Sequence, residues 1–162
     1  MLFGHLAVSA LEYRYLKAEI VPVMVAAIIP DAVDKVLHYA LGRTDSGRLW
    51  GHTLLAALLS SILVLGIWGR RHAASWALGY LSHLVCDVGS VVPWLYPLVT
   101  YDFPVSEGFV LTLWASLTQA PRLMLEIVLS GWALIALWPQ VAQWRDRWPR
   151  PKHHVGGERY ML

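Results

Sequence analysis

The sequence contains little charge and almost no cysteine. Only 15% of its 162 residues are Asp, Glu, Lys or Arg, against roughly 25% in an ordinary soluble domain. The single cysteine, Cys86, excludes an internal disulfide framework and a Cys-rich zinc module. A formal net charge of +2 is too small to indicate a nucleic-acid partner, so we expect none. A glycine-rich phosphate loop and a Gly-x-Ser-x-Gly nucleophile turn are also missing.

Hydrophobic residues make up 57% of the chain, nine of them tryptophan, and the mean hydropathy is +0.49. Intrinsic disorder is excluded, because it requires low hydrophobicity and high net charge. A chain this short cannot bury so much apolar surface in its own core. We therefore expect an integral protein of the inner or plasma membrane, with the lipid bilayer as its partner. The seven histidines stand out in such a chain, since a buried polar group without a partner costs several kcal/mol.

The hydrophobic pattern predicts an all-α membrane bundle of about five to six helices, some of them short or interfacial. An amphipathic segment at 106–119 is expected to lie in the membrane interface. Because a span of about 30 Å needs roughly 20 residues, the apolar runs 54–68 and 123–138 are slightly short and predict thin spans, tilted packing or side chains that snorkel. The expected helical segments are 4–17, 20–29 ending at Pro30-Asp31, 33–40, 54–68, 73–98 and 123–138.

Residues 1–142 are expected to form one transmembrane domain, and residues 143–162 a basic, flexible cytoplasmic tail. Positively charged residues favour the cytoplasmic side of a membrane. Threading a multi-pass chain under this rule brings several polar side chains together at the outer ends of the helices. The basic residues placed inside are Arg14, Lys17, Arg70, Arg71 and the tail arginines; the polar residues gathered outside are His5, Asp31, His52 and Asp87. Arg43 and Arg48 also fall outside, against the rule.

The clearest local signal is His83 with Asp87, four residues later in an apolar run. Residues at this spacing face the same side of a helix, and imidazole with carboxylate suits zinc or a similar divalent metal. The alternative is a hydrogen bond that satisfies both groups inside the bundle. Ionisable residues within a membrane run are functional candidates by default.

Four other polar residues carry weaker signals. Asp31 and Asp34 follow Pro30 and could either bind a metal or cap a helix. His52 begins an apolar run, and by itself is typical of an interfacial polar residue; His5 is weaker still in isolation.

The remaining histidines have less support. His38 follows Asp34 by four residues and could support a ligand. His72 lies beside two arginines, which is typical of a cytoplasmic surface, and His153 and His154 in the tail favour adventitious metal binding.

Four short motifs, in the order in which they follow one another along the chain, resemble those of the family of membrane-bound metal-dependent hydrolases. This family includes bacterial inner-membrane proteins. The resemblance covers about residues 3–100. Many members carry Pro-Asp-x-Asp-His where this chain has Pro-Asp-x-x-Asp-Lys, so no histidine adjoins the second carboxylate. The motifs are Gly4-His5, Ile29-Pro30-Asp31-Ala32-Val33-Asp34-Lys35, Gly47-Arg48 with Gly51-His52-Thr53-Leu54-Leu55, and Gly79-Tyr80-Leu81-Ser82-His83-Leu84-Val85-Cys86-Asp87.

A more distant likeness implies a ligand set. The order Asp31, His52, His83 and Asp87 is similar to one metal site of zinc-dependent phospholipase C and of the related single-strand nucleases. Those enzymes also use an N-terminal histidine, which His5 matches in position, and a last aspartate that bridges two metals. The likeness implies one or two divalent ions, zinc in particular, with Asp87 between the first ion and a second ion on His5.

The resulting hypothesis is a membrane-bound hydrolase that uses metal-activated water on a phosphate ester, such as a phospholipid or a lipid-linked phosphate. A metal lowers the pKa of its bound water from about 15.7 to about 7. Asp34 is expected to orient that water or act as general base, and Arg48 to hold a substrate phosphate through its planar guanidinium. The alternatives are a metal transporter, which needs acidic groups along a path through the bilayer, and a structural or regulatory membrane protein with a structural metal.

Overall fold

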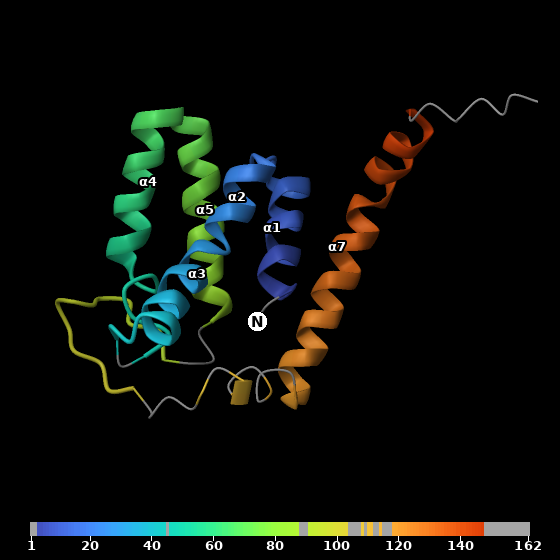
Figure 1. Cartoon of the computed structure of the whole chain (residues 1–162). Helices are drawn as coiled ribbons and strands as arrows, with labels where there is room; N and C mark the ends of the chain where they lie inside the picture. Colours follow the sequence, from blue (N-terminus) through green and yellow to red (C-terminus); the bar gives the residue numbers. More distant parts are fainter. Residues whose placement is uncertain are drawn as a thin grey trace, which may run out of the picture.

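The computed structural model describes residues 3–44, 46–87, 91–103, 108, 110–111, 114 and 118–147, with no side chains described for 144–147. All regular structure in these residues is helical, which confirms the expected all-α class (Figure 1). The elements are α1 (Phe3–Leu16), α2 (Ile20–Ala26), α3 (Ile29–Lys35), the π-helical turn η1 (Val36–Ala40), α4 (Leu54–Trp68), α5 (Arg70–Cys86) and α7 (Ala120–Arg147).

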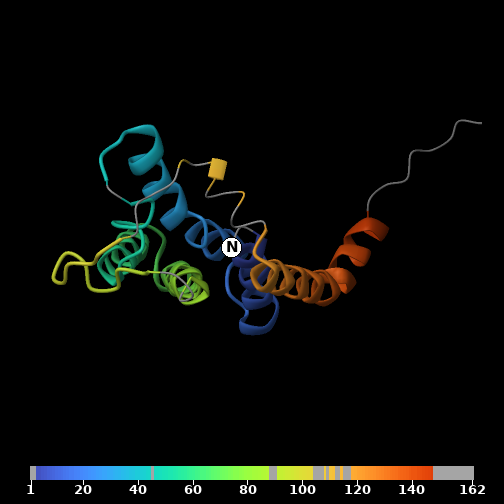
Figure 2. The ribbon, with the colours of Figure 1, turned by 90° about the horizontal axis from the view of Figure 1, so that it is seen from below.

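The long helices stand side by side. Helix α5 contacts α4 on one side and α2 and α1 on the other, and α1 also contacts α7. The view from below looks nearly along the axes of α4, α5 and α1 (Figure 2). The turns α1–α2 and α4–α5 lie at one end, whereas α3, the start of α4 and the end of α5 lie at the other (Figure 1). The second end carries the residues expected to bind a metal, and it is called the metal end below.

The break between α2 and α3 comes earlier than the sequence predicted. We expected the helix to stop at Pro30, but α2 ends at Ala26 and α3 begins at Ile29 with Pro30 in its first turn. Proline is tolerated there because the first residues of a helix have no intrahelical partner for their N–H groups. Asp31 consequently lies in the first turn of α3, where the helix dipole favours negative charge.

The expected helix over 73–98 is wrong at both ends, because α5 covers Arg70–Cys86. Only Gly69 separates α5 from α4, and its φ of 84° lets the chain reverse direction there. A positive φ of this size favours glycine. Helix α4 has the expected bounds, and the Thr53 side chain caps it by accepting from Ala56 N at 3.0 Å.

Fewer of the C-terminal residues are described by the structure. Helix α7 is longer than the expected 123–138 and continues through Pro139. Most of the amphipathic segment expected at 106–119, and the tail beyond residue 147, lie outside the described residues.

One helix among the described residues is long and apolar enough to cross a bilayer, the part of α7 from Ala120 to Gln143. Helix α4 is also apolar but has only 15 residues, or about 22 Å at 1.5 Å per residue. A bilayer core of about 30 Å exceeds that length. The predicted multi-pass topology therefore stays a prediction.

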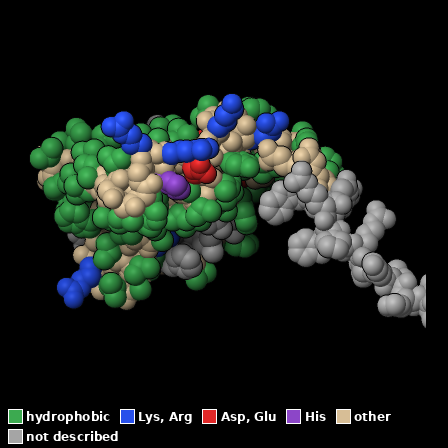
Figure 3. Space-filling model, turned by 90° about the horizontal axis from the view of Figure 1, so that it is seen from above, with side chains coloured by type: hydrophobic (Ala, Val, Ile, Leu, Met, Phe, Trp, Pro, Cys, Tyr) green, Lys and Arg blue, Asp and Glu red, His purple; other side chains and the backbone are tan. Residues whose placement is uncertain are grey.

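Basic side chains gather at the end opposite the metal end. Figure 3 looks down on this end and shows Lys and Arg side chains above a largely hydrophobic surface. Exposed residues here include Arg14, Lys17, Arg70 and Arg71, the last paired with Glu19 at 2.6 Å. The two ends thus separate Arg14, Lys17, Arg70 and Arg71 from the polar residues of the metal end. The side chains of the tail arginines lie outside the described residues, and the side of the membrane that each end faces stays a prediction.

Close backbone contact fixes α5 against α2. A Cβ atom added at Gly79 would overlap the carbonyl oxygen of Val23, a residue with no exposed surface. We predict that Gly79→Ala separates the two helices and lowers the free energy of unfolding by about 1–3 kcal/mol, measured by denaturation in detergent. The control is Gly66→Ala in α4, where the added methyl meets open space. An equal loss in both variants would contradict this packing.

Candidate metal centre

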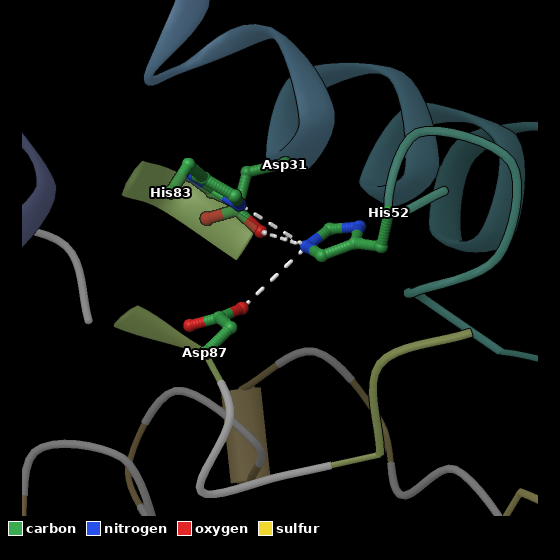
Figure 4. A group of neighbouring side chains, drawn as sticks. All are labelled: Asp31, His52, His83 and Asp87. Carbon is green, nitrogen blue, oxygen red and sulfur yellow. Dashed lines mark hydrogen bonds and ion pairs between the residues drawn. The ribbon is translucent and has the colours of Figure 1, made fainter. Parts of the chain in front are cut away.

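Four side chains from three separate segments converge at the metal end (Figure 4). Asp31 comes from α3, His52 from the loop before α4, His83 from the last turn of α5, and Asp87 from the residue that ends α5. One ligand atom of each lies within 4.8 Å of those of the others. The two histidines and Asp87 are buried, and Asp31 is partly exposed.

His52 Nε2 lies at the middle of the cluster. It is 3.2 Å from His83 Nε2, 3.6 Å from Asp31 Oδ1 and 3.5 Å from Asp87 Oδ2. The ligand atoms of a tetrahedral zinc site, each about 2.0–2.2 Å from the ion, lie about 3.3–3.6 Å from one another. The spacing around His52 therefore fits a small divalent cation.

Each Nδ1 faces an oxygen that can only accept, so Nδ1 carries a proton and Nε2 is the nitrogen left for a metal. His83 Nδ1 donates to the carbonyl oxygen of Ala27 at 2.7 Å, and His52 Nδ1 donates to Asp34 Oδ2 at 2.8 Å. With the protons on Nδ1, the two Nε2 lone pairs face one another across 3.2 Å. Such an arrangement is repulsive unless a cation, either a proton or a metal, lies there.

The charges around His52 also favour a cation. Burial lowers the pKa of His52, but its contacts with Asp31, Asp34 and Asp87 outweigh burial and raise the pKa to about 10. Burial likewise opposes ionisation of Asp87, but His5, His52 and Arg48 hold its pKa below the ordinary value.

One carboxylate oxygen of Asp31 is available to bind a metal ion. Asp31 Oδ2 pairs with Lys35 Nζ at 2.7 Å, whereas the buried Oδ1 has no hydrogen-bond partner among the described residues. Buried polar atoms are rarely left in this state. Because Asp31 Oδ1 faces His52 Nε2, a metal ion bound between them would satisfy it.

Asp34 lies behind His52. Its carboxylate, which is 1% exposed, accepts from Leu49 N at 2.6 Å and Gly51 N at 2.7 Å as well as from His52. Asp34 is inside α3, so the helix-cap alternative for it is wrong. The position supports a role in holding His52, and the expected role as general base or water-orienting group stays a prediction.

The loop that carries His52 lies tightly against α3. A Cβ atom at Gly51 would lie 2.6 Å from the carbonyl oxygen of Pro30, so this approach requires glycine. On the other side, the buried Tyr80 hydroxyl donates to Gly51 O at 2.6 Å. These contacts fix His52 relative to both α3 and α5.

Arg48 and His5 flank Asp87. Arg48 Nε lies 3.1 Å from Asp87 Oδ2, and the arginine side chain is partly exposed. His5 stacks on His83 with ring centroids 4.0 Å apart, and its Nε2 lies 3.5 Å from Asp87 Oδ1. His5 is outside the group of four but adjoins it, and a second ion on His5 stays a prediction. His38 instead has its Nδ1 2.7 Å from the carbonyl oxygen of Thr44.

The sequence interpretation missed two residues that contact the cluster or its loop, and one buried carboxylate in α1. Lys35 pairs with Asp31, and the signal was their spacing of four residues on one helix. Tyr80 supports the His52 loop, which no local pattern indicates. Glu12 is buried in α1, with Oε2 lacking a hydrogen-bond partner among the described residues; the signal was its position two turns from His5 on the same helix.

Comparison with known proteins gives one match. The sequence model of the family described as YdjM inner membrane protein matches residues 1–147. Neither the curated proteins nor the solved structures include a match. The family match supports the membrane part of the expected resemblance and extends past residue 100. It says nothing of hydrolase activity or of a likeness to phospholipase C and the nucleases.

The position of Asp34 generates a prediction. In Asp34→Asn, the amide NH₂ must face either Gly51 N or both Leu49 N and His52 Nδ1, all of them donors, so the loop that supports the His52 ring loses hydrogen bonds in either orientation. Loss of such support costs about 10–100-fold in metal affinity, which titration of the purified protein with Zn²⁺ would measure. The exposed Asp102 provides the matched control, because Asp102→Asn should bind Zn²⁺ like the unaltered chain. Unchanged affinity in Asp34→Asn would contradict this role.

Proposed function

The chain belongs to the YdjM inner membrane protein family, and from this and its metal-ligand cluster we propose that it is a membrane-bound metal-dependent hydrolase acting on a phosphate ester. The observation that most supports this proposal is the group of two imidazoles and two carboxylates around His52 Nε2. Imidazole and carboxylate together suit zinc. Zinc bound there would supply a water whose pKa is lowered to about 7.

The charges near the cluster favour an anionic substrate. Three carboxylates, those of Asp31, Asp34 and Asp87, lie beside two cationic side chains, those of Lys35 and Arg48. A divalent cation added to this set leaves it with a net positive charge. Phosphate fits the arrangement, because a planar guanidinium can hold two phosphate oxygens at once.

Each residue of the site has a separate role in this proposal. Asp31, His52, His83 and Asp87 hold the metal. Asp34 holds His52, because its two oxygens are already occupied by three donors.

Arg48 binds the substrate phosphate. Its Nε contacts Asp87, and the guanidinium has further donors for a ligand.

A structural metal site is the second candidate. Four protein ligands are typical of closed structural zinc sites, whereas catalytic sites keep one position open. The cluster also joins α3, the loop before α4 and the end of α5, which a structural metal would hold together.

The first test is metal content, measured on protein purified in detergent. We expect His83→Ala and Asp87→Ala to lose the metal that the unaltered chain carries. The control variants His38→Ala and His153→Ala should keep it, because His38 lies outside the cluster and His153 lies in the C-terminal tail. Equal metal content in all variants would contradict the ligand assignment.

The activity arm of the same test uses Arg48→Ala, with a soluble chromogenic phosphodiester and phospholipid vesicles as substrates. Loss of a charged hydrogen bond worth about 1.5–3 kcal/mol predicts a fall in kcat/KM of about 10–100-fold. Metal content should stay the same. If the metal-loaded chain turns over neither substrate, and the ligand variants lose only thermal stability, the structural role is correct and the hydrolase proposal is wrong.

A further inference from the structure

The segment after the metal ligand Asp87 is apolar but not helical. No charged residue occurs between Asp87 and Asp102. The sequence interpretation treated part of this stretch as a membrane run, whereas residues 91–103 form turns and irregular chain. We call residues 91–101 the apolar loop.

The apolar loop is built onto the metal end. Trp94 O accepts from Leu54 N, the first residue of α4, at 3.0 Å. The Trp50 and Tyr96 rings meet edge to face with centroids 4.9 Å apart. Within the loop, Leu95 N donates to the Tyr101 hydroxyl at 3.2 Å. His52 lies between Trp50 and Leu54 in sequence, so the loop has a fixed place beside the four candidate metal ligands.

Large apolar side chains of the loop are exposed. Leu98 is 90% exposed, and Leu95 and Trp50 are each about half exposed. Val91 and Val99 add further exposed apolar surface. The exposed apolar surface continues onto the start of α4, through Leu54 and Leu55.

Two constraints limit where such a loop can lie. Its irregular backbone is excluded from the hydrocarbon core, because lipid-facing N–H and C=O groups would have no partners there. Its exposed leucines and valines disfavour bulk water. The layer between headgroups and acyl chains satisfies both constraints, and tryptophan and tyrosine are enriched there.

We propose that the apolar loop and Trp50 form a membrane-docking surface, occupied by the headgroup–acyl boundary of one leaflet. The surface sets the depth of the metal end. Because it is tied to Trp50 and Leu54, it holds His52 and the other candidate metal ligands at the level of the lipid headgroups. Resting on the proposed function, this depth makes the substrate an amphiphile whose phosphate lies in the headgroup layer.

The test is the depth of a spin label at Leu98. Leu98→Cys is prepared in the full chain with Cys86→Ser, labelled, and reconstituted in vesicles of phosphatidylethanolamine and phosphatidylglycerol. Accessibility to oxygen and to a water-soluble nickel chelate reports depth. Two references carry the same label: Leu134→Cys, exposed in the middle of the α7 span, and Lys17→Cys at the basic end.

We expect the Leu98 label to lie between the two references, at the headgroup–acyl boundary. Chelate accessibility equal to that of the Lys17 label would overturn the proposal, because the loop would then lie in water. A label shielded from both reagents would also overturn it, because a second protein copy would then cover the loop. None of these readings depends on catalytic activity.

A substrate arm separates this inference from the proposed function. Leu98→Glu places a charge on the docking surface without touching the cluster. We expect it to lose turnover of phospholipid vesicles and to keep turnover of a soluble phosphodiester. Equal turnover of vesicles by Leu98→Glu and the unaltered chain would overturn the substrate class. An unaltered chain that turns over neither substrate would contradict the proposed function and leave the depth measurement standing.

Discussion

The metal end depends on the buried carboxylate of Asp34. It accepts hydrogen bonds from two backbone amides of the 49–51 loop and from the ring of His52. These bonds attach an otherwise irregular loop to α3 and fix the tautomer of His52. A buried carboxylate is costly unless several donors satisfy it. Without this interaction, the contacts of Gly51 with Pro30 and Tyr80 would still hold the loop, but the His52 ring would lose the hydrogen bond that orients it toward Asp31.

The helix packing serves the same geometry. Contact of Gly79 with Val23 lets α5 approach α2, and His83 then reaches the carbonyl oxygen of Ala27 in the turn between α2 and α3. The break at Ala27–Ile28 thus has two consequences. It frees a carbonyl that orients His83, and it places Asp31 at the start of α3. Helix ends, instead of helix middles, supply the cluster, which places it at one end of the protein.

Periodicity is a local signal and predicted the helical class and the bounds of α4, and the spacing of four residues paired His83 with Asp87. Asp31 and His52 joined this pair only through the charge-rule threading and the family resemblance. Three features needed tertiary information. The end of α5 at Cys86 and the helix break before Pro30 do not follow from an unbroken apolar run. The bonds of Asp34 to residues 49–52 are non-local, and a cap motif explained the same sequence equally well. The depth of the apolar loop depends on which side chains stay exposed.

The central claim is that one divalent metal is bound by two histidines and two aspartates. X-ray absorption at the metal edge of the zinc-loaded, detergent-solubilised protein tests it most directly. The account predicts two imidazole nitrogens and carboxylate oxygens at about 2.0–2.2 Å, with no sulfur. Sulfur at about 2.3 Å, which would assign the metal to Cys86, or a shell without imidazole would contradict it.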